Sequence, residues 1–340
     1  MTSKEIIKRI ASVDRPPRIG LDFTAWSDMA YIHAAKYLPF KAHIIEEYSW
    51  GRHPALLKEV PDFRGEVRLD SFGNIYGRLD GITKGECVKG RLDDWGALID
   101  FRMPDVDVAH FNDVKAFARA RRDKYVVVHI PPVFSLLRDM RMIENALMDT
   151  ILEKENINRL NGIICEFIDY LCGKVGGGSI DAVMVHDDWG AQEGALISEE
   201  SFVSLFKPAY ASIARSARKR GMDFILHSCG KIHSFLRHFA EAGVNVLQLD
   251  QQEIYPAQWL ADNFADKAAF HCSLDIQRIM PTGDRGLIER GAKNLAETFW
   301  NMGCGFIAKD YHPWSDICVK EEWAEWARAV FFAFAGVGGR

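Results

Sequence analysis

The 340-residue sequence predicts a (β/α)8 TIM barrel with an inserted β-ribbon in the N-terminal third. Three observations carry this prediction. Short, unbroken apolar runs recur along the chain, as expected for parallel strands covered on both faces. Amphipathic stretches fill the intervals, and eight strands with helical crossovers close most simply as a barrel. No G-x-G-x-x-G turn follows the first strand, which argues against the rival open doubly wound sheet.

Seven strands are predicted from these apolar runs. In chain order they are residues 18–24, 125–130, 181–186, 223–227, 244–249, 268–272 and 305–309. An eighth, weaker strand is expected near residues 60–67, although Pro61 disfavours a central position there. Between strands, residues 198–221 illustrate the helical pattern, because they open with a cap-like Ser-Glu-Glu and close on Gly221.

Residues 69–104 do not fit a helix. The text DSFGNIYGRLDGITKGECVKG alternates apolar residues with turn glycines, which is typical of hairpins. We therefore expect one barrel domain over residues 1–340, with an inserted β-ribbon within residues 69–104.

The composition excludes several classes of protein. The net charge is −5 and the basic residues are scattered, which argues against nucleic acid or an anionic membrane as the main partner. No secretory signal or 18-residue apolar run is apparent, so a cytoplasmic protein is expected. The seven cysteines are an odd set in a chain too large to need disulfide staples, and most are expected to be buried thiols. A homodimer remains possible.

The most informative stretch is FILHSCGKI, residues 224–232, a buried strand that ends in a His-x-Cys pair. Residues two apart on an extended segment point the same way, so His227 and Cys229 can offer a nitrogen and a sulfur to one point. Zinc accepts both donors. The alternative is a hydrogen-bonded histidine beside a buried thiol.

A catalytic zinc site usually has three protein ligands and one open position. His312 stands at the same end of the predicted barrel and ranks first as the third ligand. Cys272, which closes a neighbouring strand, ranks second. Cys304 begins the last strand, so it is expected at the opposite end of the barrel, in the core.

Other strand-end residues are candidates for substrate chemistry, because barrel active sites lie where strands end. In HDDWGAQEG, one of Asp187 and Asp188 should face the cavity while the other caps a turn or helix. Asp310 is a further candidate acid and is also within reach of the metal as an oxygen ligand. Asp22 and Lys309 are expected to contact substrate, and Gln192 could supply an amide. Trp189 could line the pocket or belong to the core. His129 could line the pocket or hydrogen-bond a backbone carbonyl.

The chain resembles the uroporphyrinogen decarboxylase superfamily, which includes zinc-dependent corrinoid methyltransferases. The segments that carry the resemblance are DSFGNIYGRL, GRLDDWGALIDFRMPD, DDWGAQEGALISEESFVSLFKPAY, FILHSCGKI, EAGVNVLQLDQQ, FHCSLDIQRIMPTGD and GCGFIAKDYHPW. The methyltransferase relatives hold zinc with His-x-Cys and a distant cysteine, and the distant position here falls close to His312. The decarboxylases carry an R-Q-A-G-R motif, but the corresponding stretch here reads LDFTAWSDMA, without arginine.

The resemblance implies a zinc-dependent methyltransferase that moves a methyl group between a corrinoid, carried by a partner protein, and a small thiol acceptor or methoxylated donor. Zinc would lie on His227, Cys229 and His312, with Asp187 or Asp188 and Asp310 orienting or protonating the substrate. Two alternatives remain open: a uroporphyrinogen decarboxylase, and a non-catalytic tetrapyrrole or corrinoid binder.

Overall fold

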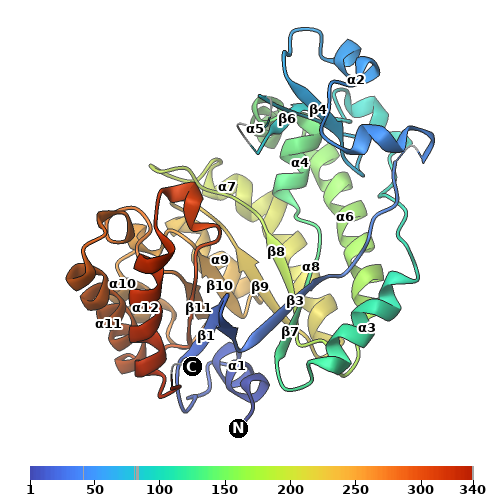
Figure 1. Cartoon of the computed structure of the whole chain (residues 1–340). Coiled ribbons are helices and arrows are strands. Elements are labelled where there is room, and N and C mark those ends of the chain that lie inside the picture. Colours follow the sequence, from blue (N-terminus) through green and yellow to red (C-terminus); the bar gives the residue numbers. More distant parts are fainter. Residues whose placement is uncertain (41, 80, 82–83, 339–340) are drawn as a thin grey trace.

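The computed structural model describes residues 1–40, 42–79, 81 and 84–338. Twelve strands appear in these residues, and eight of them run parallel around a barrel (Figure 1). The barrel strands are β1 (Gly20–Phe23), β3 (Met29–His33), β7 (Tyr125–His129), β8 (Ala182–His186), β9 (Asp223–His227), β10 (Val246–Leu249), β11 (Ala269–Cys272) and β12 (Phe306–Lys309). The predicted (β/α)8 fold is thus confirmed.

All seven strongly predicted strands are present, but the eighth was misplaced. The missing barrel strand is β3, not residues 60–67, which contribute only the start of a separate small sheet. β3 follows β1 directly through the short antiparallel strand β2 (Trp26–Ser27), with no helix between them. The chain therefore turns back twice within a few residues, and β3 pairs in parallel with β7.

The sheet closes where β1 meets the start of β3, and Asp28 fastens this seam. The backbone N–H of Asp28 donates to the carbonyl of Leu21 at 2.7 Å, and its carboxylate accepts the N–H of Leu21 at 3.0 Å. Arg18 donates to both carboxylate oxygens at 2.7 Å. Asp28 is fully buried, so this bidentate pair satisfies a carboxylate that would otherwise be costly.

The N-terminal helix α1 (Ser3–Ala11) forms the floor of the barrel, below the strands in Figure 1. A capping box between Thr2 and Glu5 fixes its start. Its buried residues Ile6, Ile7 and Ile10 pack against the inward-facing side chains of the strands. The lower half of the barrel is thereby filled with hydrocarbon, and polar residues are left for the upper half.

Helices cover the outside of the barrel and bury the main core against it. They are α3 (His110–Ala120), α4 (Phe134–Arg141), α5 (Ile143–Leu152), α6 (Lys154–Val175), α7 (Glu199–Ser201) continuing through the π-helical η3 (Phe202–Phe206) into α8 (Lys207–Arg218), α9 (His233–Ala242), α10 (Ala257–Phe264), α11 (Arg285–Asn301) and α12 (Glu321–Phe334). Short helical turns are η2 (Trp95–Ile99), η4 (Gln252–Ile254), η5 (Met280–Thr282) and η6 (Trp314–Ile317). No helix in the described residues is long and apolar enough to span a membrane.

The inserted segment is antiparallel, as expected for the β-ribbon within residues 69–104, but it forms a three-stranded sheet whose first strand begins at Glu66, before that range. Its strands are β4 (Glu66–Leu69), β5 (Ile75–Arg78) and β6 (Glu86–Lys89); residues 80 and 82–83 of the expected ribbon lie outside the described residues. With η1 (Ala42–Tyr48) and α2 (Pro54–Glu59) it stands beside the ends of α4 and α6 (Figure 1). Its own small core contains Leu56, Val67 and Ile75.

Candidate functional site

A cavity of about 690 Å³ opens at the carboxyl ends of the barrel strands. Parallel register sets its polar residues at one level, because Asp22 pairs with Lys309 across β1 and β12, and Gln248 pairs with both His227 and His271 across β9, β10 and β11. The lining residues are Asp22, Phe23, Thr24, Ser27, Met29, Tyr31, His129, Met184, His186, His227, Gln248, Asp250, Lys309, Asp310 and His312. Active sites of such barrels lie at this end.

Three potential metal ligands meet beside this cavity: His227 lines it, whereas Asp188 and Cys229 lie next to His227 and are not among the lining residues. Sγ of Cys229 lies 3.5 Å from Nε2 of His227, and that nitrogen lies 3.6 Å from Oδ1 of Asp188. The donor atoms of all three residues are within 4.8 Å of one another. No other such group of three occurs among the residues that the structure describes.

Two glycines allow this convergence. Gly190 follows β8 and Gly230 follows β9, and a Cβ on Gly230 would lie 2.3 Å from the backbone of Gly190. Gly230 also has a φ of +76°, which side chains disfavour. Because the two loops touch here, the backbone N–H of Cys229 reaches Oδ1 of Asp188 at 2.9 Å.

The three donors fit a zinc ion. For tetrahedral zinc with bonds of about 2.0–2.3 Å, neighbouring ligand atoms lie about 3.4–3.6 Å apart. The 3.5 Å and 3.6 Å separations at His227 match that spacing. Burial, followed by the charges of Asp188 and Asp250, raises the pKa of the Cys229 thiol, so this sulfur is held neutral until a cation compensates it.

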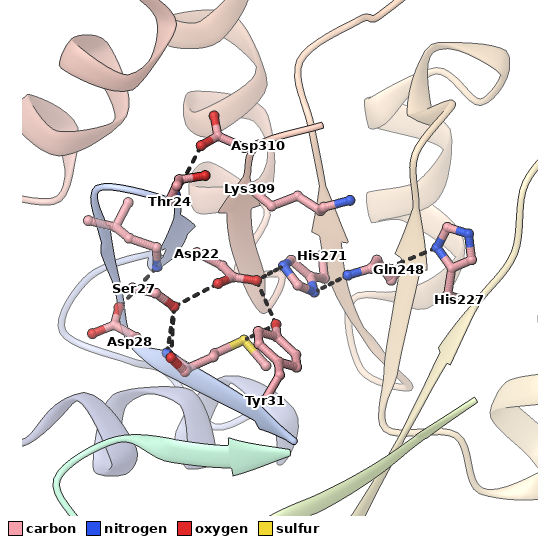
Figure 2. Close-up of polar contacts among 12 residues, drawn as sticks. Asp22, Thr24, Ser27, Asp28, Tyr31, His227, Gln248, His271, Lys309 and Asp310 are labelled. Carbon is pink, nitrogen blue, oxygen red and sulfur yellow. Dashed lines mark hydrogen bonds and ion pairs between the residues drawn. The ribbon is translucent and has the colours of Figure 1, made fainter. Parts of the chain in front are cut away.

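A chain of polar contacts leads away from His227 across the strands (Figure 2). Nδ1 of His227 lies 2.9 Å from Oε1 of Gln248, and Nε2 of Gln248 lies 2.9 Å from Nδ1 of His271. Nε2 of His271 is 3.0 Å from Oδ2 of Asp22, although its N–H is not aligned for a linear hydrogen bond. Gln248 and His271 are buried, so the chain is shielded from bulk water.

Asp22 ends this chain as a carboxylate. It accepts hydrogen bonds from the hydroxyls of Ser27 at 2.6 Å and Tyr31 at 2.5 Å. Burial alone would raise the pKa of Asp22, but the adjacent His271 ring, together with the hydrogen bonds from Ser27 and Tyr31, outweighs this effect and lowers the pKa to about 2. The predicted substrate residue Asp22 is thus largely engaged by protein donors.

Four histidines form a row of neighbouring rings, one from each of β3, β7, β8 and β9, and the last three of them line the cavity. The ring centroids of His33 and His129 are 5.2 Å apart, those of His129 and His186 5.0 Å, and those of His186 and His227 4.8 Å. Burial and neighbouring positive charge lower the pKa of His129 to about 4 and that of His186 to about 3. Both rings are therefore neutral near pH 7. His129 lines the cavity. Of the two alternatives that the sequence left open, this is the pocket position.

The adjacent carboxylates Asp187 and Asp188 have separate environments. Asp187 is fully buried and accepts the backbone N–H groups of Val133, Phe134 and Ser135 at 2.6–3.0 Å, which caps α4. The Tyr210 hydroxyl also donates to it at 2.6 Å. Asp187 therefore holds the fold together, whereas Asp188 faces His227 and Cys229.

Two predicted substrate residues lie away from the cavity. Trp189 is fully buried in an aromatic cluster, stacked on Phe134 with ring centroids 4.0 Å apart, and its indole N–H donates to Tyr210 at 2.8 Å. The structure thus places it in the core, the other alternative that the sequence left open. Gln192 is exposed on the loop after β8 and is not among the lining residues.

The last strand contributes two charged lining residues, and both have partners. Lys309 donates to Asp250, which follows β10. Asp310 accepts from Nε of Arg328 on α12 at 2.9 Å and from the backbone N–H of Thr24 at 3.1 Å. Burial raises the pKa of Asp310, with the Arg328 charge opposing the shift.

The two candidates for a third ligand are placed differently. His312 is exposed and lines the cavity, but it is outside the group formed by Asp188, His227 and Cys229. Cys272 is fully buried in the core under the helices. The reason is strand alternation: His271 points into the barrel, so Cys272 points out. The structure therefore does not bring Cys272 together with His227, and Cys304 is likewise in the core.

The sequence analysis did not identify Gln248, His271 and Tyr31 as site residues. It also did not identify Asp188 as the third potential metal ligand. A signal existed for two of them, since the runs VLQL and AFHC each carry one polar residue inside a buried strand. Such a residue must be hydrogen-bonded or functional, because an unpaired buried polar group is costly.

Comparison with known proteins adds a family and a fold. The family model described as "Uroporphyrinogen decarboxylase (URO-D)" matches residues 127–310, which is more than half of the chain. A solved structure described as a methyltransferase from Methanosarcina mazei shares 13% identity, with a TM-score of 0.66 over 98% of this chain and 99% of that one. D-psicose 3-epimerase from Clostridium cellulolyticum H10 shares 13% identity over 72% and 86% of the two chains, with a TM-score of 0.36. No curated protein sequence matches the chain.

Proposed function

The chain belongs to the uroporphyrinogen decarboxylase family, and on that premise we propose that it is a zinc-dependent methyltransferase. It moves a methyl group between a corrinoid, carried by a partner protein, and a small thiol acceptor or methoxylated donor. The observation that carries the proposal is the convergence of Asp188 and Cys229 on His227, which lines the cavity, with separations suited to zinc.

The charge of the cavity favours this reaction over decarboxylation of a porphyrinogen. Asp22, Asp250 and Asp310 line it together with a single cation, Lys309, and no arginine occurs among its described lining residues. A substrate with eight carboxylates needs several cations, preferably arginines that bind carboxylates through two hydrogen bonds. A small thiol or ether makes no such demand.

The proposed residue roles follow from position. His227 and Cys229 hold the zinc with Asp188, and His312, which lines the cavity from the loop after β12, remains a candidate fourth ligand. Bound zinc lowers the pKa of a substrate thiol or polarises an ether oxygen. His129 and His186 present neutral rings to the substrate, while the Lys309–Asp250 and Arg328–Asp310 pairs keep the cavity wall rigid.

Methyl transfer to a thiol balances without a redox partner. The substrate sulfur would attack the methyl carbon, forming a carbon–sulfur bond as the bond from carbon to the corrinoid breaks. The electron pair of the broken bond would stay with the corrinoid, and the thiol proton would be lost to water at the open end of the cavity. The reaction on the metal of the corrinoid belongs to that cofactor.

Elemental analysis tests the proposal. Protein purified without chelator is expected to hold about one zinc per chain, in line with a three-ligand catalytic site. The double variant His227→Ala, Cys229→Ala should hold none, whereas the control His110→Ala, Cys165→Ala, which alters the same residue types outside the cavity, should match the parent. Equal zinc in the parent and the first variant would overturn the proposal.

Two turnover assays separate the remaining alternatives. The methyltransferase should consume methylcobalamin in the presence of a small thiol, which is followed by absorbance. Loss of carboxyl groups from uroporphyrinogen would instead identify a decarboxylase, the reaction after which the matching family model is named. Corrinoid or tetrapyrrole binding without either reaction, and without zinc, would identify a non-catalytic binder.

A further inference from the structure

In the chain of contacts from Asp22 to His227, the donor and the acceptor at each step are determined by the carboxylate of Asp22. An ionised carboxylate only accepts hydrogen bonds. Asp22 receives the hydroxyls of Ser27 and Tyr31, and its Oδ2 also faces Nε2 of His271 at 3.0 Å. Nε2 of His271 must therefore carry a proton, because a bare nitrogen there would repel the carboxylate.

The proton on Nε2 of His271 in turn determines which group of Gln248 faces this histidine. His271 is fully buried, and a second proton on its ring would place an imidazolium in the interior. In the neutral ring, Nδ1 is then an acceptor. It lies 2.9 Å from Nε2 of Gln248, so the amide group donates to it.

The orientation of the Gln248 amide in turn determines which ring nitrogen of His227 carries the proton. With its NH2 group directed at His271, the amide turns its oxygen toward Nδ1 of His227 at 2.9 Å. An amide oxygen only accepts, so Nδ1 of His227 carries the proton. Nε2 is left bare, 3.5 Å from Sγ of Cys229 and 3.6 Å from Oδ1 of Asp188.

From this geometry we propose that Asp22, His271 and Gln248 form a tautomer lock, a set of positioning residues that keeps the proton on Nδ1 of His227 and leaves Nε2 ready to bind a cation. The inference rests on the proposed function only in taking His227 as a cation ligand. The opposite state needs the Gln248 amide turned over and two protons on His271. Burial of that charge disfavours it.

A lock of this kind raises cation affinity without touching the cation. A metal-ligating histidine commonly donates its other N–H to a fixed acceptor, and loss of that acceptor typically costs about 10–100-fold in metal affinity. Here the acceptor is an amide, which by itself can turn either way. His271 and Asp22 fix the amide so that its oxygen faces Nδ1 of His227. A carboxylate in place of Gln248 would present an oxygen there without such help.

The first test observes the tautomer in the wild-type protein without metal. Nitrogen NMR of protein labelled with ¹⁵N-histidine distinguishes a protonated from a bare ring nitrogen, and the His227→Ala variant assigns the signal. The expected result is a neutral His227 with its proton on Nδ1. A proton on Nε2 would overturn the lock, and this outcome does not depend on whether zinc binds.

The second test separates the lock from simple packing. Gln248→Met keeps the side-chain length but removes both hydrogen bonds, so zinc affinity, measured by competition with a chromophoric chelator, should fall about 10–100-fold. Gln248→Glu keeps an acceptor for Nδ1 of His227 and should stay within about fivefold of the parent. A side chain that only fills space would give the reverse order, which would contradict the proposal.

Two controls complete the design. Gln252→Met alters another buried glutamine, whose amide donates to the carbonyl of Tyr255 and not to the lock, and should leave zinc affinity unchanged. Thermal unfolding of each variant shows that the fold is retained. If the wild-type protein binds no zinc, the proposed function fails, while the NMR measurement still decides the lock.

Discussion

Asp188 accepts the backbone N–H of Cys229 at 2.9 Å and presents the same oxygen 3.6 Å from Nε2 of His227. Its neighbour Asp187 points the other way and caps α4. Two adjacent carboxylates therefore make opposite contributions, one to the candidate metal site and one to the stability of the fold.

Replacing Asp188 should affect the metal site and little else. Asp188→Asn removes a charged oxygen donor, so zinc affinity should fall by about tenfold or more. The side chain is 46% exposed, so the free energy of unfolding should change by less than about 1 kcal/mol. Chelator competition and urea unfolding measure the two quantities. Unchanged zinc affinity would remove Asp188 from the ligand set.

Replacing Asp187 should give the reverse result. Asp187→Asn places an NH2 group or a weaker acceptor against three backbone donors and the Tyr210 hydroxyl. We expect a loss of about 2–4 kcal/mol in the free energy of unfolding, because hydrogen bonds to buried charges are strong. Zinc affinity of the folded protein should remain within about threefold of the parent. A stable variant without zinc would contradict this assignment.

Arg328 should be essential for stability because it neutralises Asp310. Both side chains are less than a tenth exposed, so Arg328→Met leaves a buried carboxylate without its partner. The expected cost is about 3–5 kcal/mol by denaturant unfolding. Arg285→Met is the matched control, since that arginine pairs with Glu289 on the surface and should cost at most about 1 kcal/mol. Similar costs for the two variants would be inconsistent with this reading.

His312 and Cys272 can be compared directly as zinc ligands. Cys272→Ala should leave zinc content unchanged but lower stability by about 1–2 kcal/mol, because it creates a small cavity in the core. His312→Ala should leave stability nearly unchanged, since the side chain is exposed, and should weaken zinc binding if this histidine closes the coordination shell. Zinc loss in the Cys272 variant would show that the strand alternation argument is wrong.

His129 makes stability depend on pH. Burial, with the charge of His33, lowers its pKa to about 4, whereas an unfolded histidine titrates near pH 6.5. Between these values the unfolded chain binds a proton that the folded chain does not, so stability is full above pH 6.5 and falls toward pH 4. In His129→Gln that fall should be smaller by about 1 kcal/mol, after allowance for partial exposure. Unfolding curves at pH 7 and 4.5 measure it.

The strands were predictable where the local pattern matched the final environment. Residues 125–128 and 224–226 are continuous apolar runs because helices cover one face and the barrel interior the other. β3 was missed because MAYIH lies within two reversals of the chain, with Ser27 and Asp28 just before it. Its partner β7 is almost a hundred residues away, so only the closed barrel reveals the pairing.

The site was predictable only in part, for a related reason. His227 and Cys229 are two residues apart, so their common direction follows from strand geometry. Asp188 joins them because Gly190 and Gly230 let two loops touch, which depends on tertiary contact. The inward direction of Gln248 depends on the phase of its strand, which a run buried on both faces does not display.

The floor made by α1 decides how reactants move. Ile7 and Ile10 close the barrel at the amino ends of the strands. Reactants must therefore enter at the carboxyl ends, between the loops that follow the strands. A methyl donor on a protein carrier and a small acceptor would then share one doorway. Because the proposed transfer is direct, both reactants would have to be present at this end together, so the small acceptor would have to enter the cavity before the carrier covers its opening.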